Sequence, residues 1–322
     1  MDGEPAGATG TTHPTDGNTS DGEQRILERL LNLRQHQQDG KRSPHKPLLA
    51  LLALARIDAV GSSAIPWVEA RQQLGNLLVE FGPTSTASAP QSAAYPFTRL
   101  RSDDVWVLDE DVPMDRIGPL DRHHVTGRFV ESVEQALKDR RTLYATARAL
   151  VEAEFPPSVA GDVLTAVGFD PDEIYGSPAD LAAPGTGTPP ARRRSAHWPA
   201  QILAAWDRQC AFCGFDGQLG FGSVGLEAAH VRWFTYDGPD SLDNGVALCA
   251  LHHKLFDRGA LGLTEDHRIV VSDQFTARTE AGRRVYELAD RALRPRPGTR
   301  LPAPEHLRWH ATQVFKGHLL AG

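Results

Sequence analysis

Three cysteines and one histidine of this chain stand at the spacing of metal ligands. Two residues separate Cys210 from Cys213, and two residues separate Cys249 from His252. Three sulfurs and one imidazole make the closed four-coordinate set that a structural Zn²⁺ prefers, whereas a redox-active cysteine pair would not need the second pair. The other interpretation makes Cys249 a core thiol and His252 a surface residue. Because the set uses every cysteine in the sequence, we predict a structural zinc site.

Two further histidines and one asparagine lie close to these ligands in the sequence. His230 stands in an apolar, strand-like segment, and Asn244 and His253 follow a turn-rich stretch. An imidazole titrates near neutral pH, so His230 could draw a proton from the water that attacks a phosphodiester. His253 could supply a ligand to a metal ion that neutralises charge on the phosphate. A lone histidine is more often structural. The sequence spacing between Asn244 and His253 favours a hydrolytic site here instead.

The pattern as a whole resembles the ββα-metal fold of HNH endonucleases, through Cys210-x2-Cys213, Ala229-His230-Val231, Asn244 and Cys249-x2-His252-His253. The resemblance implies that His230 is the general base and that Asn244 holds the loop between strand and helix. It also implies that His253 binds the catalytic divalent cation, Mg²⁺ or Mn²⁺. A weaker likeness to the HNH branch found in restriction enzymes covers residues 254–261 and 307–315. Trp309 and Phe315 are interpreted there as core residues, and Lys254, Arg258 and Arg232 as candidate phosphate contacts.

One position departs from the HNH pattern. Many HNH sites carry an acidic or histidine metal ligand directly before the general base, where this chain has Ala229. Glu227 is two residues earlier and therefore on the same strand face, and Asp257 is one helical turn beyond His253. Either carboxylate could complete the cation site. Ala229 also leaves open a DNA-binding protein whose nuclease site is degenerate.

The length of 322 residues and the hydrophobic pattern predict an α+β protein of two domains. We expect a disordered tail (residues 1–22), a DNA-binding domain (23–175), a linker rich in Pro, Gly, Ala and Thr (176–194) and a nuclease domain with a C-terminal helical extension (195–322). Helical periodicity predicts helices beginning at residue 23 and over 47–57, 65–81, 132–155 and 198–208. Residues 95–100 and 105–108 are expected to form a small β-hairpin after a loop at 82–92.

The first domain has a second distinctive pattern, formed by Arg42-Ser43-Pro44-His45-Lys46-Pro47, Tyr95-Pro96-Phe97 and the segment ending at Trp106. It resembles the sulfur-binding domain of McrA-like type IV restriction endonucleases, which recognise phosphorothioated DNA. The resemblance implies that Tyr95 and Pro96 form an apolar cup for the sulfur. The cations that would hold the neighbouring DNA backbone are Arg34, Lys41, Arg42 and Arg122.

An apolar cup is a physically reasonable reader of sulfur. Sulfur is larger, softer and more poorly hydrated than the oxygen it replaces, so such a cup would desolvate an ordinary phosphate at a cost. Without the resemblance, Tyr95-Pro96-Phe97 would be interpreted as a core aromatic cluster and the Arg42 segment as a solvated helix entry.

Net charge and composition set limits on partners and location. The net charge of −7 does not by itself indicate a polyanion ligand, although local basic stretches such as residues 34–46 and 122–128 permit basic faces. No apolar run is long enough for a membrane helix, and residues 1–22 lack the features of a secretory signal. We therefore expect a cytoplasmic protein that binds double-stranded DNA and no membrane.

These inferences combine into one functional hypothesis. The first domain would find phosphorothioated DNA, and the tethered HNH domain, whose local concentration is thereby raised, would cut nearby. An endonuclease specific for methylated cytosine is the alternative within enzymes, although it would need an aromatic cage or a base-flipping pocket. Because one HNH site cuts one strand at a time, a homodimer is also expected.

Overall fold

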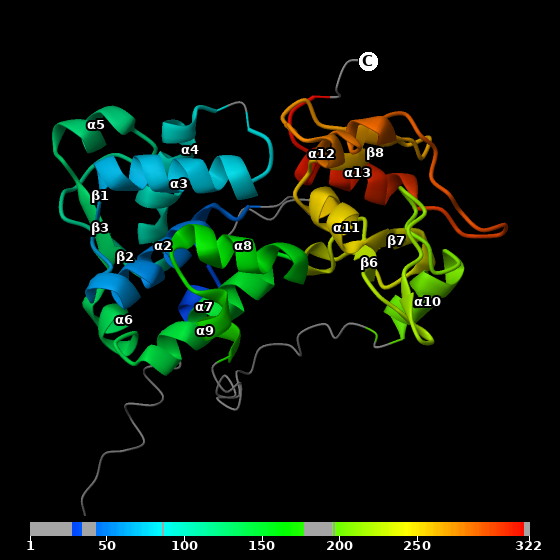
Figure 1. Cartoon of the computed structure of the whole chain (residues 1–322). Helices are drawn as coiled ribbons and strands as arrows, with labels where there is room; N and C mark the ends of the chain where they lie inside the picture. Colours follow the sequence, from blue (N-terminus) through cyan, green and yellow to red (C-terminus); the bar gives the residue numbers. More distant parts are fainter. Residues whose placement is uncertain (1–27, 34–42, 86, 177–194, 196, 319–322) are drawn as a thin grey trace, which may run out of the picture.

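The computed structural model describes residues 28–33, 43–85, 87–176, 195 and 197–318. It consists of a mainly helical N-terminal unit and a C-terminal unit with small sheets, which lie side by side (Figure 1). This agrees with the predicted two-domain α+β class. The expected tail (1–22) and nearly all of the expected linker (176–194) lie outside the described residues.

The N-terminal unit contains, in chain order, α2 (His45–Val60), β1 (Ile65–Pro66), α3 (Trp67–Phe81), α4 (Ala89–Arg99), η1 (Leu100–Asp103), β2 (Trp106–Leu108), α5 (Ile117–Arg122), β3 (Thr126–Phe129), α6 (Glu131–Ala136), α7 (Arg140–Glu154), α8 (Pro157–Val167) and α9 (Pro171–Gly176). Residues 28–31, the described part of the helix expected from residue 23, are also helical. The structure therefore confirms the predicted helices at 47–57 and 65–81, apart from their ends.

The central helix of this unit is α2. Its leucines at positions 48, 49, 51 and 54 are fully buried, since α3, α4, α7 and α8 pack around it. The helix ends at Gly61, whose left-handed conformation (φ 75°) lets its N–H bond to Ile57 O. A helix that is apolar on most of its surface is expected to be buried in the core, as α2 is.

The predicted hairpin at residues 95–108 is wrong in its first half. Residues 95–99 belong to α4, which begins after Ser88, whose side chain accepts a hydrogen bond from Gln91 N. The aromatic run suggested a strand, but the cap and the small residues Ala93 and Ala94, both buried, favour a helix packed on α2 and α3. β2 is a strand as predicted, but it pairs with β3, in a sheet of order β1-β3-β2.

The helix predicted over residues 132–155 is divided. α6 ends at Ala136, and α7 begins after Asp139, whose carboxylate accepts a hydrogen bond from Thr142 N at 3.0 Å. The helices α5, α8 and α9 were also not predicted. Of these, α8 has the greatest functional interest, because it contacts α11 of the C-terminal unit.

The C-terminal unit contains α10 (Trp198–Ala205), β4 (Gln218–Leu219), β5 (Gly222–Ser223), β6 (Leu226–His230), η2 (Phe234–Tyr236), η3 (Leu242–Asn244), β7 (Gly245–Cys249), α11 (Ala250–Asp257), β8 (Leu261–Leu263), β9 (Ile269–Val271), α12 (Glu280–Arg283), η4 (Tyr286–Leu288) and α13 (Pro304–Gln313). β6 and β7 form an antiparallel pair in which His230 lies opposite Gly245. α11 follows β7 directly, which completes a ββα unit. α10 packs against both strands.

The two units share part of their packing. Trp233, Tyr236 and Trp309 of the C-terminal unit belong to the same buried cluster as the core of the N-terminal unit. The Tyr236 hydroxyl donates a hydrogen bond of 2.5 Å to Glu154 Oε2 on α7. Trp309 and Phe315, predicted to be core residues, are both buried. Within the described residues, we find no helix of the length and apolarity required to cross a membrane.

Candidate active site and metal centre

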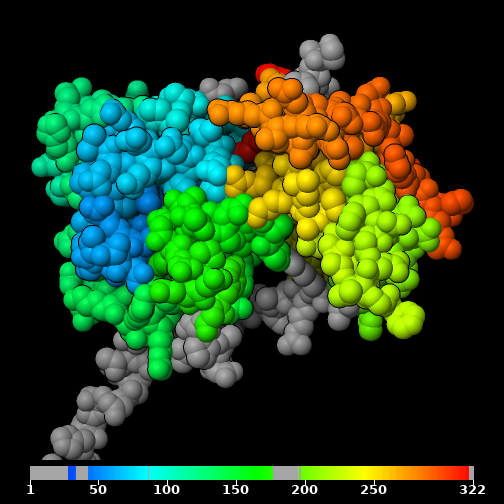
Figure 2. Space-filling view, in the orientation of Figure 1, coloured from blue at the N-terminus to red at the C-terminus, as the bar shows by residue number. Residues whose placement is uncertain are grey.

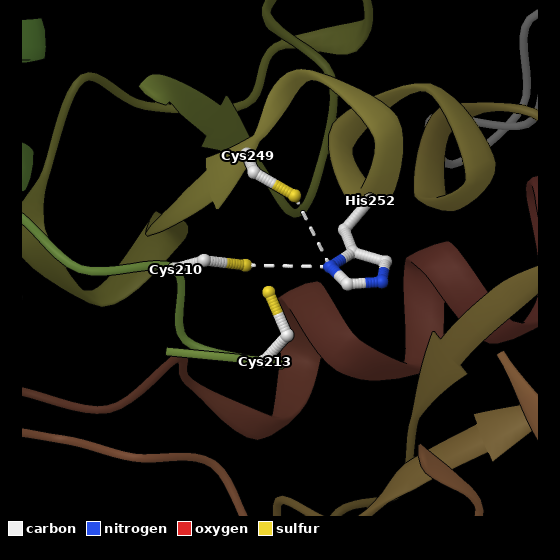
Figure 3. A group of neighbouring side chains, drawn as sticks. All are labelled: Cys210, Cys213, Cys249 and His252. Atoms are coloured by element: carbon white, nitrogen blue, oxygen red, sulfur yellow. Dashed lines mark hydrogen bonds between the residues drawn. The ribbon is translucent and has the colours of Figure 1, made fainter. Parts of the chain in front are cut away.

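The four predicted zinc ligands converge on one point (Figure 3). Cys210 and Cys213 flank a turn after α10, Cys249 ends β7, and His252 is in the first turn of α11. Their ligand atoms all lie within 4.8 Å of one another. His252 Nδ1 is 3.2 Å from Cys249 Sγ and 3.5 Å from Cys210 Sγ. This closed set of three sulfurs and one imidazole fits a structural Zn²⁺.

Proton affinities in the cluster reflect the crowding of its polar atoms. Hydrogen bonds from the thiols of Cys213 and Cys249 lower the pKa of Cys210. Burial alone would lower the pKa of His252, but its hydrogen bonds to Cys210 and Cys213 raise that pKa to about 9. The cluster thus stabilises a thiolate, which is the form of cysteine that binds a metal.

His230 is held on one ring face and at one ring edge. Its imidazole stacks on Trp198 of α10, with ring centroids 3.7 Å apart and planes at 14°. Its Nε2 lies 2.8 Å from Asp240 Oδ1, and the side chains are 12% and 13% exposed. A carboxylate at Nε2 favours the neutral tautomer with its proton on that atom, in which Nδ1 carries the lone pair. The arrangement suits a general base with a fixed orientation.

Asn244 holds the loop that joins β6 to β7. It is fully buried, and its Oδ1 accepts a hydrogen bond from Arg232 N at 2.8 Å. Its Nδ2 donates to Arg232 O and Pro239 O, both at 3.0 Å. These bonds fix the two ends of the segment that carries Asp240. Asn244 therefore acts on this loop and has no place in the lining of the candidate catalytic cavity described below.

His253 lies between two carboxylates. Its Nδ1 is 2.6 Å from Glu227 Oε2 on β6, and its Nε2 is 3.0 Å from Asp257 Oδ2, one turn later on α11. Burial alone would lower the pKa of His253, but the charge of Asp257 and the hydrogen bonds to both carboxylates raise it to about 10. The hydrogen bond to His253 in turn lowers the pKa of Glu227.

The two carboxylates differ in exposure and in their other partners. The Glu227 side chain is 50% exposed, whereas that of Asp257 is 2% exposed. Asp257 Oδ1 accepts a hydrogen bond of 2.9 Å from Trp233 Nε1, and Oδ2 accepts one from Ser158 Oγ of α8. Both oxygens of Asp257 are therefore engaged, while Glu227 is accessible to an ion.

One cavity of about 360 Å³ collects the candidate catalytic side chains. Glu227, His230, His253 and Asp257 line it, and so do residues 156–158, where the chain enters α8. A candidate general base and a candidate metal ligand in one cavity suit phosphodiester hydrolysis. Residues of both α8 and α11 line it, and the green and yellow segments that contain these helices touch in Figure 2.

The basic residues beside this cavity are already paired. Sequence reasoning favoured Lys254, Arg258 and Arg232 as phosphate contacts. Lys254 Nζ lies 2.9 Å from Asp162 Oδ1 of α8, and Arg258 pairs with Asp162 and with Glu80 of α3. Arg232 Nε donates to Tyr236 O at 2.7 Å. Two of these cations therefore hold the units together in this arrangement.

The predicted DNA-reading residues are only partly described. Tyr95 is half-buried in α4, with the guanidinium carbon of Arg99 5.5 Å from its ring centroid, and Pro96 next to it is buried. Arg122 is exposed in the last turn of α5. Arg34, Lys41 and Arg42 lie outside the described residues. How these cations relate to Tyr95 therefore stays a prediction.

Sequence reasoning missed Asp240, Trp198 and Ser158. The loop contains Asp237, Asp240 and Asp243, and nothing in their order shows which one contacts His230. Trp198 had a usable signal, because an aromatic residue at the start of the predicted helix could face the strand. Ser158 belongs to a helix that was not predicted at all.

Two family models match the chain. Residues 23–172 match the ScoMcrA-like DNA sulfur-binding domain, and residues 210–264 match an HNH endonuclease model. None of the curated proteins matches the chain significantly. The two models cover both segments in which the sequence patterns were found.

Among solved structures, the sulfur-binding domain of ScoMcrA complexed with phosphorothioated DNA is similar over 44% of this chain and 97% of its own, at 17% identity and a TM-score of 0.38. The type IV phosphorothioation-dependent restriction endonuclease ScoMcrA matches 77% of this chain and 84% of its own, at 12% identity and a TM-score of 0.36. The modification-dependent TagI restriction endonuclease matches 38% of each chain, at 25% identity and a TM-score of 0.30.

Proposed function

We propose that this chain, which matches models of a ScoMcrA-like DNA sulfur-binding domain and of an HNH endonuclease, is a restriction endonuclease that binds phosphorothioated DNA and cuts it nearby. The observation that carries the nuclease half is the cavity shared by His230, Glu227 and His253. The match to the sulfur-binding model carries the recognition half.

In this proposal His230 is the general base. It takes a proton from the water that attacks the phosphorus, while Asp240 holds the ring and stabilises the imidazolium that forms. The stacked Trp198 keeps the ring from rotating. Asn244 contributes indirectly, because its hydrogen bonds hold the loop on which Asp240 stands.

Glu227 and His253 are the proposed ligands of the catalytic cation, Mg²⁺ or Mn²⁺. The carboxylate and the imidazole Nδ1 face each other at 2.6 Å beside the cavity, which fits a cation that accepts oxygen and nitrogen ligands. When bound, such an ion stabilises negative charge on the phosphate and on the leaving oxygen. Asp257 accepts a hydrogen bond from Nε2 and thereby orients His253, a role that its buried, engaged oxygens suit.

The cysteine cluster is proposed to hold a structural Zn²⁺. Its ligands tie the turn after α10 to the junction of β7 and α11. That junction carries His253, so the zinc would fix one side of the nuclease cavity. All four ligands of this ion would be protein atoms, which leaves no coordination position for a reacting water.

Recognition of sulfur is proposed for the surface around Tyr95 and Pro96. A half-buried aromatic ring beside a buried proline offers an apolar contact that a thiophosphoryl sulfur tolerates better than a hydrated oxygen. Arg34, Lys41, Arg42 and Arg122 are the proposed contacts to the flanking backbone.

The proposed domain limits are 23–175 and 195–322, joined by a linker at 176–194. A dimer in which each copy cuts one strand is proposed for double-strand cleavage. The cytoplasmic location stays a prediction from the sequence.

The proposal is tested with matched duplexes that are phosphorothioated, cytosine-methylated or unmodified, each incubated with Mg²⁺, Mn²⁺ or EDTA. We expect cleavage of the phosphorothioated duplex alone, and only with a divalent cation. Cleavage of the methylated duplex would overturn the assignment of the mark. Binding of the phosphorothioated duplex without cleavage under any condition would overturn the nuclease assignment and favour a degenerate site.

A further inference from the structure

The nuclease cavity includes residues from the sulfur-binding domain. Pro156, Pro157 and Ser158, at the start of α8, line it together with His253 and Asp257. These residues lie almost a hundred positions before α11 in the sequence, yet α8 and α11 lie against each other (Figure 1). The cavity wall is therefore built by both domains.

Ser158 makes the most specific of these contacts. Its Oγ donates a hydrogen bond to Asp257 Oδ2, the same oxygen that lies 3.0 Å from His253 Nε2. Trp233 Nε1 donates to the other oxygen at 2.9 Å. The buried carboxylate of Asp257 is thus held by one donor from each domain, and its orientation sets that of His253.

Ion pairs keep α8 in the position that this contact needs. Lys254 of α11 and Arg258, the residue directly after this helix, both pair with Asp162, which stands one turn after Ser158, at 2.9 and 3.2 Å. Lys254 Nζ also donates to the backbone oxygen of Ser158. Because the cations lie in and directly after the helix that carries His253 and Asp257, they fix the register of the two helices next to the cavity.

We propose that Ser158 is a positioning residue of the nuclease, supplied by the sulfur-binding domain. It holds Asp257, and through it the His253 imidazole, in the orientation that binds the catalytic cation. The inference rests on the proposed nuclease function and adds that the metal site is complete only while the two domains are docked.

Removal of the hydroxyl would leave Asp257 Oδ2 buried with one donor fewer. An under-bonded buried carboxylate reorients, and that change loosens His253. Loss of a hydrogen bond behind a metal ligand typically weakens metal affinity or activity by about 10- to 100-fold. Since Ser158 acts through Asp257, we expect about a tenfold loss.

The test compares zinc-loaded wild-type protein with Ser158→Ala, Ser158→Thr and Thr165→Ala. Thr165 is a matched control, because it is an exposed hydroxyl residue on the same helix and bonds only locally, to Gly161 O. Affinity for Mn²⁺ is measured without DNA by electron paramagnetic resonance of the free ion. Cleavage of the phosphorothioated duplex is then measured as kcat and KM.

We expect Ser158→Ala to weaken Mn²⁺ affinity and lower kcat by about tenfold, with KM little changed, and Ser158→Thr to restore both. The proposal would be overturned if Ser158→Ala bound Mn²⁺ with wild-type affinity. It would also be overturned if Ser158→Ala cut faster than wild type, because the contact would then only cover the site. Should Ser158→Ala not fold, Asp162→Asn tests the same docking and must also weaken Mn²⁺ affinity. Because Mn²⁺ binding is measured without DNA, failure of wild-type cleavage would count against the proposed function alone.

Discussion

The imidazole Nε2 of His230 lies 2.8 Å from Oδ1 of Asp240, a residue of the loop between β6 and β7. Ser195 N donates a second hydrogen bond to this carboxylate, at 2.6 Å to Oδ2. Asp240 therefore has a fixed position at the edge of the ring, while Trp198 covers its face. Together these two contacts define the orientation of the proposed base.

Asp240→Asn should lower kcat for cleavage between about tenfold and a few hundredfold, because the amide neither favours the same tautomer nor stabilises the imidazolium. Single-turnover cleavage of the phosphorothioated duplex measures the effect. Asp237→Asn is the matched control, since Asp237 is exposed in the same loop and its left-handed backbone (φ 62°) tolerates asparagine. Wild-type rates in Asp240→Asn would contradict the assigned role.

The adjacent histidines of α11 separate the two proposed metal sites. His252→Ala should remove the Zn²⁺ found in the purified protein and lower the unfolding temperature, because a structural zinc contributes to folding free energy. His253→Ala should retain the Zn²⁺ and lose cleavage. Elemental analysis of both variants measures the difference. Equal zinc content in the two variants would contradict the division of roles.

Tyr95→Ala should reduce the preference for phosphorothioated over unmodified DNA. Loss of an aromatic wall costs about 1–2 kcal/mol of apolar contact, which corresponds to roughly tenfold in Kd for the modified duplex only. Fluorescence anisotropy in EDTA measures both dissociation constants. Tyr175→Ala is the control, because Tyr175 is a partly exposed tyrosine elsewhere in the same domain. An equal loss for both duplexes would place Tyr95 outside the sulfur contact.

The capping carboxylate of α7 predicts a pH-dependent stability effect. Hydrogen bonds from the side chain and backbone of Thr142 lower the pKa of Asp139. Because the folded-state pKa is below the unfolded value of about 3.9, the contribution is fully present above that pH and is lost as the pH falls through the folded-state pKa.

Asp139→Ala should therefore lower the unfolding free energy by about 1 kcal/mol at neutral pH, and by less near about pH 3. Urea-unfolding midpoints at the two pH values measure this. Asp139→Asn, which keeps a capping oxygen, should have the smaller effect at neutral pH. The cap assignment fails if the loss in Asp139→Ala is the same at both pH values.

Local patterns in the sequence predicted the parts of this fold that are set by local chemistry. α2 was predictable because every residue from 47 to 55 is apolar, and the zinc cluster because two short pairs contain all its ligands. The segment at residues 95–99 was mispredicted, since aromatic content suggested a strand and only the packing against α2 and α3 shows why a helix forms.

Contacts between distant segments were beyond sequence reasoning. Lys254 and Arg258 looked like phosphate ligands because their charge is evident, whereas their partners Asp162 and Glu80 belong to another domain. The choice between Glu227 and Asp257 as metal ligand likewise depends on burial, which the fold determines. Ser158 enters the site only through the docking of α8 on α11.

The central claim is that one chain reads sulfur in one domain and cuts with His230 in the other. The most direct measurement follows wild-type protein and His230→Ala on the same phosphorothioated duplex, with anisotropy for binding in EDTA and gel analysis for cleavage in Mn²⁺. We predict equal affinity for the duplex and cleavage by the wild type only. Cleavage by His230→Ala at the wild-type rate, or loss of its binding, would contradict the account.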